Sequence, residues 1–157
     1  TVPDKIKLKE GINMAVILAS SCLLGCECRY KGDGCKCDAL IKLAESNTII
    51  GVCPEQMGGL PTPRDPAERQ GDKVISCAGK DVTKAYTKGA ETALYFAKLN
   101  HVDFAVMKAK SPSCGKGLIY DGTFTGNKIP GNGVTVELLN ANGIPVFTED
   151  ELDQLPL

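Results

Sequence analysis

Short apolar runs alternate with amphipathic, helix-like stretches along this chain. The predicted strands are residues 15–19 (AVILA), 48–52 (TIIGV), 103–108 (DFAVMK) and 144–147 (IPVF). The first run is apolar throughout, which is typical of strands buried on both faces of a parallel sheet. The predicted helices between the strands are residues 37–46, 81–100 and 134–142. This alternation predicts an α/β fold: a single three-layer domain with a mainly parallel sheet, Rossmann-like in organisation.

Two further segments are rich in turn-forming residues. Residues 54–71 hold four of the nine prolines, which predicts a stiff loop, and residues 73–76 (KVIS) predict a short extra strand. The glycine-rich residues 120–133 lack the spacing of a phosphate-binding loop, so nucleotide-phosphate binding has little support. We expect these glycines to let backbone amides approach a cofactor or substrate closely.

Length and charge exclude several classes of protein. A chain of 157 residues suits one domain, which we assign to residues 14–157, while residues 1–13 are interpreted as a tag, an upstream extension or an arm. The net charge of −1, without a Lys/Arg run, offers no footprint for long nucleic acid. No signal peptide is readable, and no apolar run approaches the roughly 20 residues that span a bilayer. We therefore expect a cytoplasmic protein with reduced thiols and no membrane partner.

Three of the eight cysteines directly follow predicted strands. Cys22 comes after the first strand, Cys53 after the second, and Cys114 after the third, within the motif SPSCG. The loops after the carboxyl ends of parallel strands lie on one edge of the sheet, and neighbouring strands are about 4.8 Å apart. We therefore expect these three thiols to converge on one point.

Three converging thiols indicate a cofactor with an open position better than a closed structural metal site. Soft sulfur ligands select zinc, copper(I) or iron–sulfur clusters, and structural zinc usually takes four ligands from C-x₂₋₄-C pairs. A cubane iron–sulfur cluster on three cysteines leaves one iron free to act as a Lewis acid. The ferredoxin run C-x₂-C-x₂-C is absent, which disfavours a pure electron carrier. The alternative, in which the three cysteines are small buried hydrophobic residues, stays open.

Several motifs occur in a characteristic order between residues 20 and 149. They are SCLLG (21–25), CRY (28–30), CPE (53–55), GGLP (58–61), PR (63–64), PAE (66–68), DVT (81–83), GA (89–90), Lys108, SPSCG (111–115), YDG (120–122) and FTG (124–126). In these motifs the chain resembles the bacterial and archaeal TudS family, long known only as a domain of unknown function, which includes thiouracil desulfidase.

The resemblance implies a [4Fe–4S] cluster held by Cys22, Cys53 and Cys114. It also implies an enzyme that replaces the thiocarbonyl sulfur of a thiolated pyrimidine with oxygen, without redox chemistry, and releases sulfide. Its partner is then a small molecule: a thiolated base, nucleoside or nucleotide. The chemistry is coherent, because iron binds soft sulfur and makes the attached carbon electrophilic toward an activated water.

Four residues near the cysteines are candidates for further catalytic roles. Glu55 is the first candidate for the general base, although a surface carboxylate or a cap on a loop amide is an equal alternative. Ser111 and Ser113 either hydrogen-bond the substrate or the cluster, or shape a turn. Lys108 either offsets the charge of the cluster or forms a salt bridge.

The remaining cysteines form a local group. Cys26, Cys28, Cys35 and Cys37 give the pattern C-x-C-x₆-C-x-C, which is compatible with an accessory metal, with disulfides after oxidation, or with free thiols. Cys77 is interpreted as a free thiol.

Two charged features have structural interpretations. His101 is expected to contact the last carbonyls of the preceding helix, and as the only histidine it leaves no His-based hydrolase chemistry. Arg64 and Glu68 are expected to form a salt bridge that locks the proline-rich loop; otherwise Arg64 meets an anionic group of the substrate.

Two alternatives to the enzyme remain. One is a metal- or cluster-binding module without catalysis, acting as a redox or sulfur-transfer partner. The other is the handling of thionucleosides within RNA, which the absence of a basic stripe disfavours.

Overall fold

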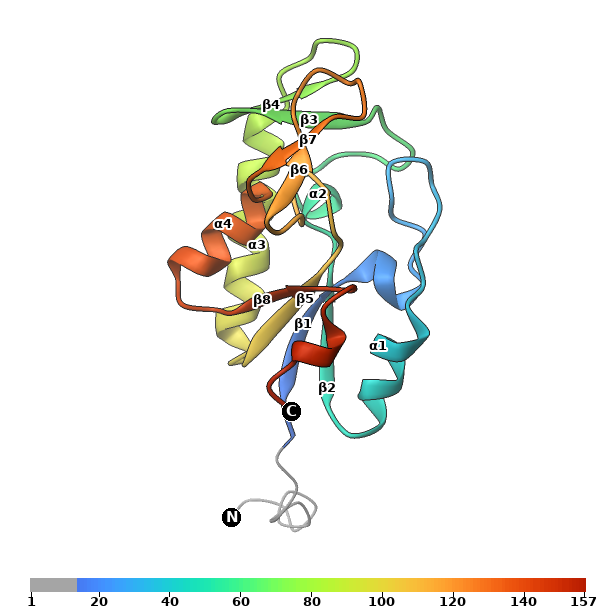
Figure 1. Cartoon of the computed structure of the whole chain (residues 1–157), viewed down its shortest axis with the longest axis vertical. Helices are drawn as coiled ribbons and strands as arrows, with labels where there is room; N and C mark the ends of the chain where they lie inside the picture. The colour runs from blue at the N-terminus through green and yellow to red at the C-terminus, as the bar shows by residue number, and fades with distance from the viewer. Residues whose placement is uncertain (1–13) are drawn as a thin grey trace.

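The computed structural model describes residues 14–157. Its centre is a parallel four-stranded sheet with the strand order β2-β1-β5-β8 (Figure 1). The strands are β1 (Val16–Ser20), β2 (Thr48–Val52), β5 (Phe104–Met107) and β8 (Val146–Thr148). The predicted α/β class and parallel sheet are confirmed. The segment 1–13, interpreted as a tag, an extension or an arm, lies outside the described residues.

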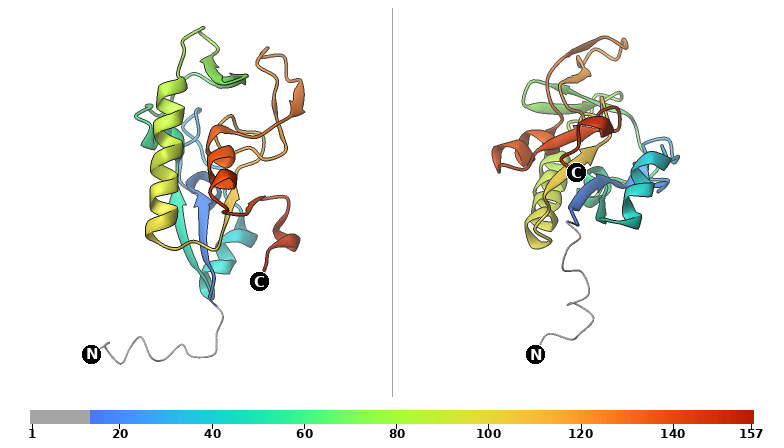
Figure 2. Two further views of the ribbon diagram at one scale, coloured as in Figure 1. Left: turned by 90° about the vertical axis from the view of Figure 1, so that its left-hand side faces the viewer. Right: turned by 60° about the horizontal axis from the view of Figure 1, so that its bottom comes forward.

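Helices cover both faces of this sheet (Figure 2). One face packs against α3 (Thr83–Leu99) and α4 (Val134–Ala141), and the other against α1 (Asp38–Lys42), which continues into the 3₁₀ turn η3 (Leu43–Glu45). Alternation along β1 explains the two cores: Leu18 faces the α3–α4 layer, whereas Ile17 and Ala19 face the α1 layer. All three are fully buried, as the apolar run predicts.

The segments predicted as irregular contain short regular elements. The predicted stiff loop 54–71 holds α2 (Pro54–Met57) and β3 (Ala67–Gln70), and β3 pairs antiparallel with the predicted extra strand β4 (Lys73–Ser76). The glycine-rich stretch contains β7 (Lys128–Pro130), which pairs with β6 (Leu118–Tyr120). Both hairpins rise beyond the carboxyl edge of the sheet (Figures 1 and 2). The two hairpins therefore form a separate layer beyond the strand ends.

Two 3₁₀ turns complete the described chain: η2 (Ser21–Leu24), directly after β1, and η4 (Leu152–Gln154), near the C-terminus. No helix in residues 14–157 is long and apolar enough to cross a membrane.

Candidate active site

A pocket of about 490 Å³ opens at the carboxyl edge of the sheet, beneath the two hairpins. We call floor the more buried lining that follows β1, β2 and β5, which includes Cys22, Cys53 and Cys114, and mouth the more exposed lining, which includes Arg29, Lys110 and Phe124. Open parallel sheets bind their ligands at this edge.

The structure brings the three strand-end cysteines to this pocket. Cys22 lies in η2, Cys53 directly precedes α2, and Cys114 lies in the loop after β5; all three line the cavity. Cys22 and Cys114 are buried, with 8% and 6% of their surface exposed. Their convergence is what the strand-end argument predicts, and their role as ligands stays a prediction.

A fourth thiol belongs to the same wall. Cys28 lines the pocket at 1% exposure, and the Cys53 thiol donates to its carbonyl oxygen at 3.8 Å. Hydrogen bonding to the Cys22 thiol, together with burial, outweighs an opposing contact with Cys53 and raises the pKa of Cys28 to about 12. By sequence Cys28 belongs to the local cysteine group, although its position in the CRY motif distinguishes it from its neighbours.

The other members of that group do not share the cavity. Cys26 is exposed, Cys35 and Cys37 are partly buried, and none of them lines the pocket. In the part of the chain that the structure describes, no group of three or more His, Cys, Asp or Glu side chains is arranged to hold a metal ion. All eight cysteines are free thiols, Cys77 among them. The absence of such a group among the described residues holds for Cys22, Cys53 and Cys114 as well, so it does not separate the two sets of cysteines, and an accessory metal at Cys26, Cys28, Cys35 and Cys37 stays a prediction.

The donor set of the pocket suits a sulfur-ligated cofactor. Burial raises the pKa of Cys114 to about 12, against smaller opposing hydrogen bonds, and hydrogen bonding to Cys28 together with burial also raises the pKa of Cys53. Thiols in such surroundings become thiolates when a cation displaces their protons, which couples occupancy of the site to deprotonation. Thiolate sulfur selects soft metals and iron–sulfur clusters.

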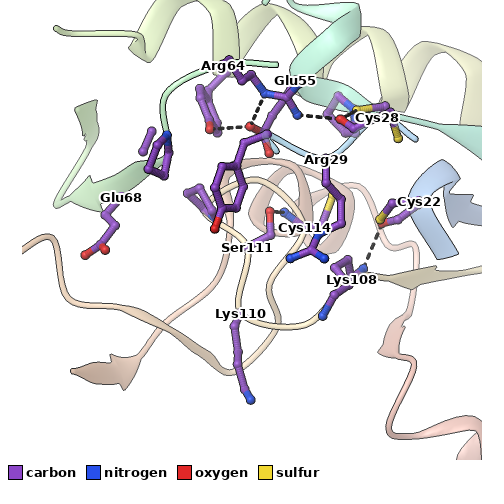
Figure 3. Close-up of a pocket in the computed structure, with 18 of the residues that line it drawn as sticks. Cys22, Cys28, Arg29, Glu55, Arg64, Glu68, Lys108, Lys110, Ser111 and Cys114 are labelled. Atoms are coloured by element: carbon purple, nitrogen blue, oxygen red, sulfur yellow. Dashed lines mark hydrogen bonds and ion pairs between the residues drawn. The ribbon is translucent and has the colours of Figure 1, made fainter. Parts of the chain in front are cut away.

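Glu55 stands beside these cysteines, on the first turn of α2. Its Oε1 accepts hydrogen bonds from Arg64 Nε at 3.0 Å and from the Tyr86 hydroxyl at 2.8 Å (Figure 3). Burial, followed by the nearby Glu55 carboxylate, raises the pKa of Tyr86, so its phenol stays protonated and donates. Among the described residues no partner holds the second carboxylate oxygen, Oε2. Glu55 is thus an oriented carboxylate in the lining of the pocket with one oxygen free of partners within residues 14–157, and neither a surface residue nor a cap.

Two glycines allow this arrangement. A Cβ atom at Gly58 would collide with the Ala85 carbonyl, and one at Gly89 would collide with the Pro54 carbonyl. Because neither position has a Cβ, α2 packs directly against the backbone of α3. This close approach places Glu55 next to Tyr86.

The expected salt bridge between Arg64 and Glu68 is wrong. The Arg64 side chain is 6% exposed and pairs with Glu55, and its guanidinium also donates to the carbonyl of Cys28 at 2.8 Å. Glu68 instead accepts hydrogen bonds from the backbone amides of Gly122 and Phe124. The partner of Glu68 is set by the packing of the β3–β4 hairpin against the β6–β7 hairpin. The short distance between Arg64 and Glu68 in the sequence does not decide it.

The two serines have different environments. Ser111 lines the pocket, and its Oγ accepts from the backbone amides of Ser113 and Cys114 at 3.1 and 3.0 Å, which is the turn-shaping role that the sequence left open. Ser113 is fully buried away from the cavity, and its hydroxyl bonds that of Thr135 at 2.8 Å.

Lys108 forms the salt bridge that was one of its two interpretations. Its Nζ lies 2.8 Å from Glu149 Oε1, while its backbone amide donates to Ser20 Oγ at 2.9 Å. Burial lowers the pKa of Lys108, but the hydrogen bond and the charge of Glu149 outweigh it, and the net pKa is raised. Lys108 therefore stays a cation at the pocket wall.

Exposed cations and rings form the mouth of the pocket. Arg29 points into the cavity, and Lys110 extends away from the cysteines (Figure 3). The Arg29 side chain is 31% exposed and has a long ion pair of 3.4 Å with Asp33. His101, in contrast, follows α3 with φ 51° and is exposed and absent from the pocket lining.

Comparisons with known proteins agree along nearly the whole described chain. A family model described as 2-thiouracil desulfurase matches residues 17–151. The uncharacterized protein YbbK of Bacillus subtilis (strain 168) is 42% identical over 150 residues, which cover 89% of this chain and 99% of that protein. A solved structure named [4Fe–4S]-dependent thiouracil desulfidase TudS is 45% identical and superposes with a TM-score of 0.86, covering 90% of this chain and 95% of its own. The family model and the solved structure thus agree in naming removal of sulfur from thiouracil.

Proposed function

This chain belongs to the 2-thiouracil desulfurase family, and from that membership we propose that it is a [4Fe–4S]-dependent desulfidase. It replaces the thiocarbonyl sulfur of a thiolated pyrimidine with oxygen and releases sulfide. One observation carries the proposal: thiols from the ends of three neighbouring strands line the same cavity as an oriented carboxylate. A structural cysteine site has no need of that carboxylate.

Cys22, Cys53 and Cys114 are the residues that hold the cluster in this proposal. When bound, the cluster supplies an iron that no cysteine occupies, which acts as a Lewis acid toward soft thiocarbonyl sulfur. Lys108 is a partly buried cation in the pocket lining that pairs with Glu149. It offsets part of the negative charge that thiolates and sulfides bring to the pocket.

Glu55 is the general base. Arg64 and Tyr86 occupy its Oε1, so Oε2 is the oxygen that accepts the proton of an attacking water. The water oxygen forms a bond to the ring carbon that carries sulfur, and the carbon–sulfur bond breaks as that oxygen becomes the product carbonyl. Both protons of the water end on the released sulfide or in solvent, so the net change is C=S + H₂O → C=O + H₂S. No electron enters or leaves the reaction.

The serines support this chemistry in two ways. Ser111 Oγ accepts two backbone N–H bonds, and its own proton remains available for a hydrogen bond to the substrate. Ser113 acts from behind the pocket: its bond to Thr135 fixes the turn that carries Cys114.

The pocket has room for a thiolated base, nucleoside or nucleotide. Arg29 and Lys110 at the mouth favour the nucleotide, because its phosphate is the anionic group that these cations would meet. A net charge of −1 still disfavours long nucleic acid. Free thiols at all eight cysteines suit a reducing compartment, and we place the enzyme in the cytoplasm.

The test begins with the cofactor. After anaerobic reconstitution we expect about four irons and four acid-labile sulfides per chain, lost when Cys22, Cys53 and Cys114 are all replaced by Ala. Exposed Cys77→Ser is the matched control and should retain the full complement. Sulfide release from thiopyrimidines by the loaded wild type then tests the reaction. A loaded protein that releases no sulfide would make it a non-catalytic cluster-binding module or a sulfur-transfer partner.

A further inference from the structure

The loop of residues 121–127, between β6 and β7, presents an aromatic side chain at the mouth of the pocket. Phe124 lines the cavity and is 38% exposed. Its backbone has φ 58°, in the left-handed region that residues with a Cβ rarely adopt. A large apolar side chain that is exposed and held in a disfavoured backbone conformation indicates a binding role.

Glu68 holds this loop in place from the neighbouring hairpin. The residue is 8% exposed, and its Oε1 accepts the amide of Gly122 at 3.0 Å and that of Phe124 at 3.2 Å. Within the loop, Asp121 Oδ1 accepts from the amide of Thr123 at 2.9 Å. These bonds fix the backbone of the loop up to and including Phe124, so the position from which its side chain extends is set before a ligand arrives.

Phe124 is also the aromatic residue of the pocket whose ring has no other partner. Four aromatic side chains line the cavity: Tyr30, Tyr86, Tyr120 and Phe124. Tyr86 is 1% exposed and its hydroxyl serves the carboxylate of the site. Tyr30 and Tyr120 each have a lysine ammonium over the ring, 5.7 and 5.2 Å from the centroid. Within residues 14–157, no second ring or cation covers Phe124.

We propose that Phe124 stacks on the pyrimidine ring of the substrate and that Glu68 is the positioning residue that presents it. This inference rests on the proposed desulfidase function. A flat heteroaromatic ring matches a free aromatic face, and such stacking tolerates changes of ring substituent because every base has a π-face. Phe124 thereby selects for aromatic thiocarbonyl compounds over flexible ones such as thioamides.

Kinetics provide the first measurement. Phe124→Leu keeps the apolar bulk but removes the π-face, and it should raise KM for 2-thiouracil about 10-fold while kcat changes less than about 3-fold. Phe124→Tyr should restore the wild-type KM. Tyr95→Leu is the matched control, because Tyr95 is a 61% exposed aromatic residue on α3 that does not line the pocket, and its KM should not change.

Fluorescence measures binding without turnover. The chain contains no tryptophan, so Phe124→Trp creates a single reporter at the mouth. In the cluster-loaded protein, uracil should quench this tryptophan saturably, as stacking requires. Tyr95→Trp places the same fluorophore elsewhere and corrects for absorption by the ligand and the cluster; its emission should show no saturable change.

The role of Glu68 is tested by rescue. Glu68→Ala should raise KM as Phe124→Leu does, whereas Glu68→Gln keeps an acceptor oxygen for the two amides and should stay close to wild type. The double variant Glu68→Ala/Phe124→Leu should be no worse than Phe124→Leu alone, because both changes remove one stacking contact.

The outcomes separate the two proposals. An active wild type together with an unchanged KM in Phe124→Leu, or with no saturable quenching in Phe124→Trp, would overturn the stacking assignment alone. A loaded wild type that releases no sulfide from any thiopyrimidine would overturn the proposed function, and the stacking assignment with it.

Discussion

The floor and the mouth of the pocket are built in different ways. The floor carries cysteines on the ends of central strands, and its thiols at Cys22 and Cys114 are at most 8% exposed. The mouth consists of loops and hairpins, where Phe124 is 38% exposed and the Arg29 side chain 31%. Buried segments that follow the strands thus position the groups that act on the reacting atoms, and exposed loops hold the groups that contact the substrate around those atoms.

This difference has a consequence for mutations. Changes at the floor should remove the cofactor or kcat, because the groups there act on the reacting atoms. Changes at the mouth should alter KM, because those groups contact the substrate equally before and during the reaction.

The largest effect is expected at the cysteine floor. Cys53→Ser removes one soft ligand, so anaerobic reconstitution should yield less iron and the remaining cluster should be lost rapidly, with sulfide release at background. Iron, acid-labile sulfide and visible absorption measure this. The same change at exposed Cys26 should leave all three at wild-type values; a loss there equal to that of Cys53→Ser would contradict the assignment of the cluster to the strand ends.

The second-largest effect is expected at Glu55, the proposed general base. Glu55→Gln keeps an oxygen for the Tyr86 hydroxyl but loses proton acceptance, so kcat should fall about 10²–10⁴-fold with the iron content unchanged. Single-turnover sulfide release by loaded protein is the measurement. Undiminished turnover would remove Glu55 from the mechanism.

A smaller loss is expected for the group that orients this base. Tyr86→Phe deletes one of the two bonds to Glu55 Oε1 while Arg64 retains the other, so kcat should fall about 10-fold, with KM little changed. Steady-state kinetics with matched iron content measure this. If KM and not kcat responds, Tyr86 contacts the substrate and does not orient Glu55.

The smallest effect is expected at the mouth. Arg29→Gln should raise KM about 5-fold for a thiolated nucleotide at low salt, less at high salt, and not for the free base, because only the nucleotide has a phosphate to attract. The ratio of the two KM values, measured at two ionic strengths, tests it. An equal rise for the base would show that Arg29 contacts the ring.

The hydrophobic pattern within each segment was sufficient to predict the main strands and helices of the fold. The apolar runs and the helical stripes predicted all four strands of the central sheet and the three main helices around it, because burial of alternate side chains is a property of each segment. Prolines and glycines obscured α2, β3 and β7. The helix α2 is only four residues long, and the strands β3 and β7 take their hydrogen bonds from a neighbouring strand.

For the candidate site, the sequence by itself determined which cysteines follow strands, and the parallel order of those strands brings Cys22, Cys53 and Cys114 to one edge. Only the tertiary structure decided that Arg64 pairs with Glu55 and not with Glu68, that Cys28 joins the floor, and that Phe124 faces the cavity. The physical reason is the range of the interactions. Hydrophobic periodicity acts within one segment, whereas an ion pair or a pocket wall depends on how distant segments pack, as the close approach of α2 to α3 at two glycines shows.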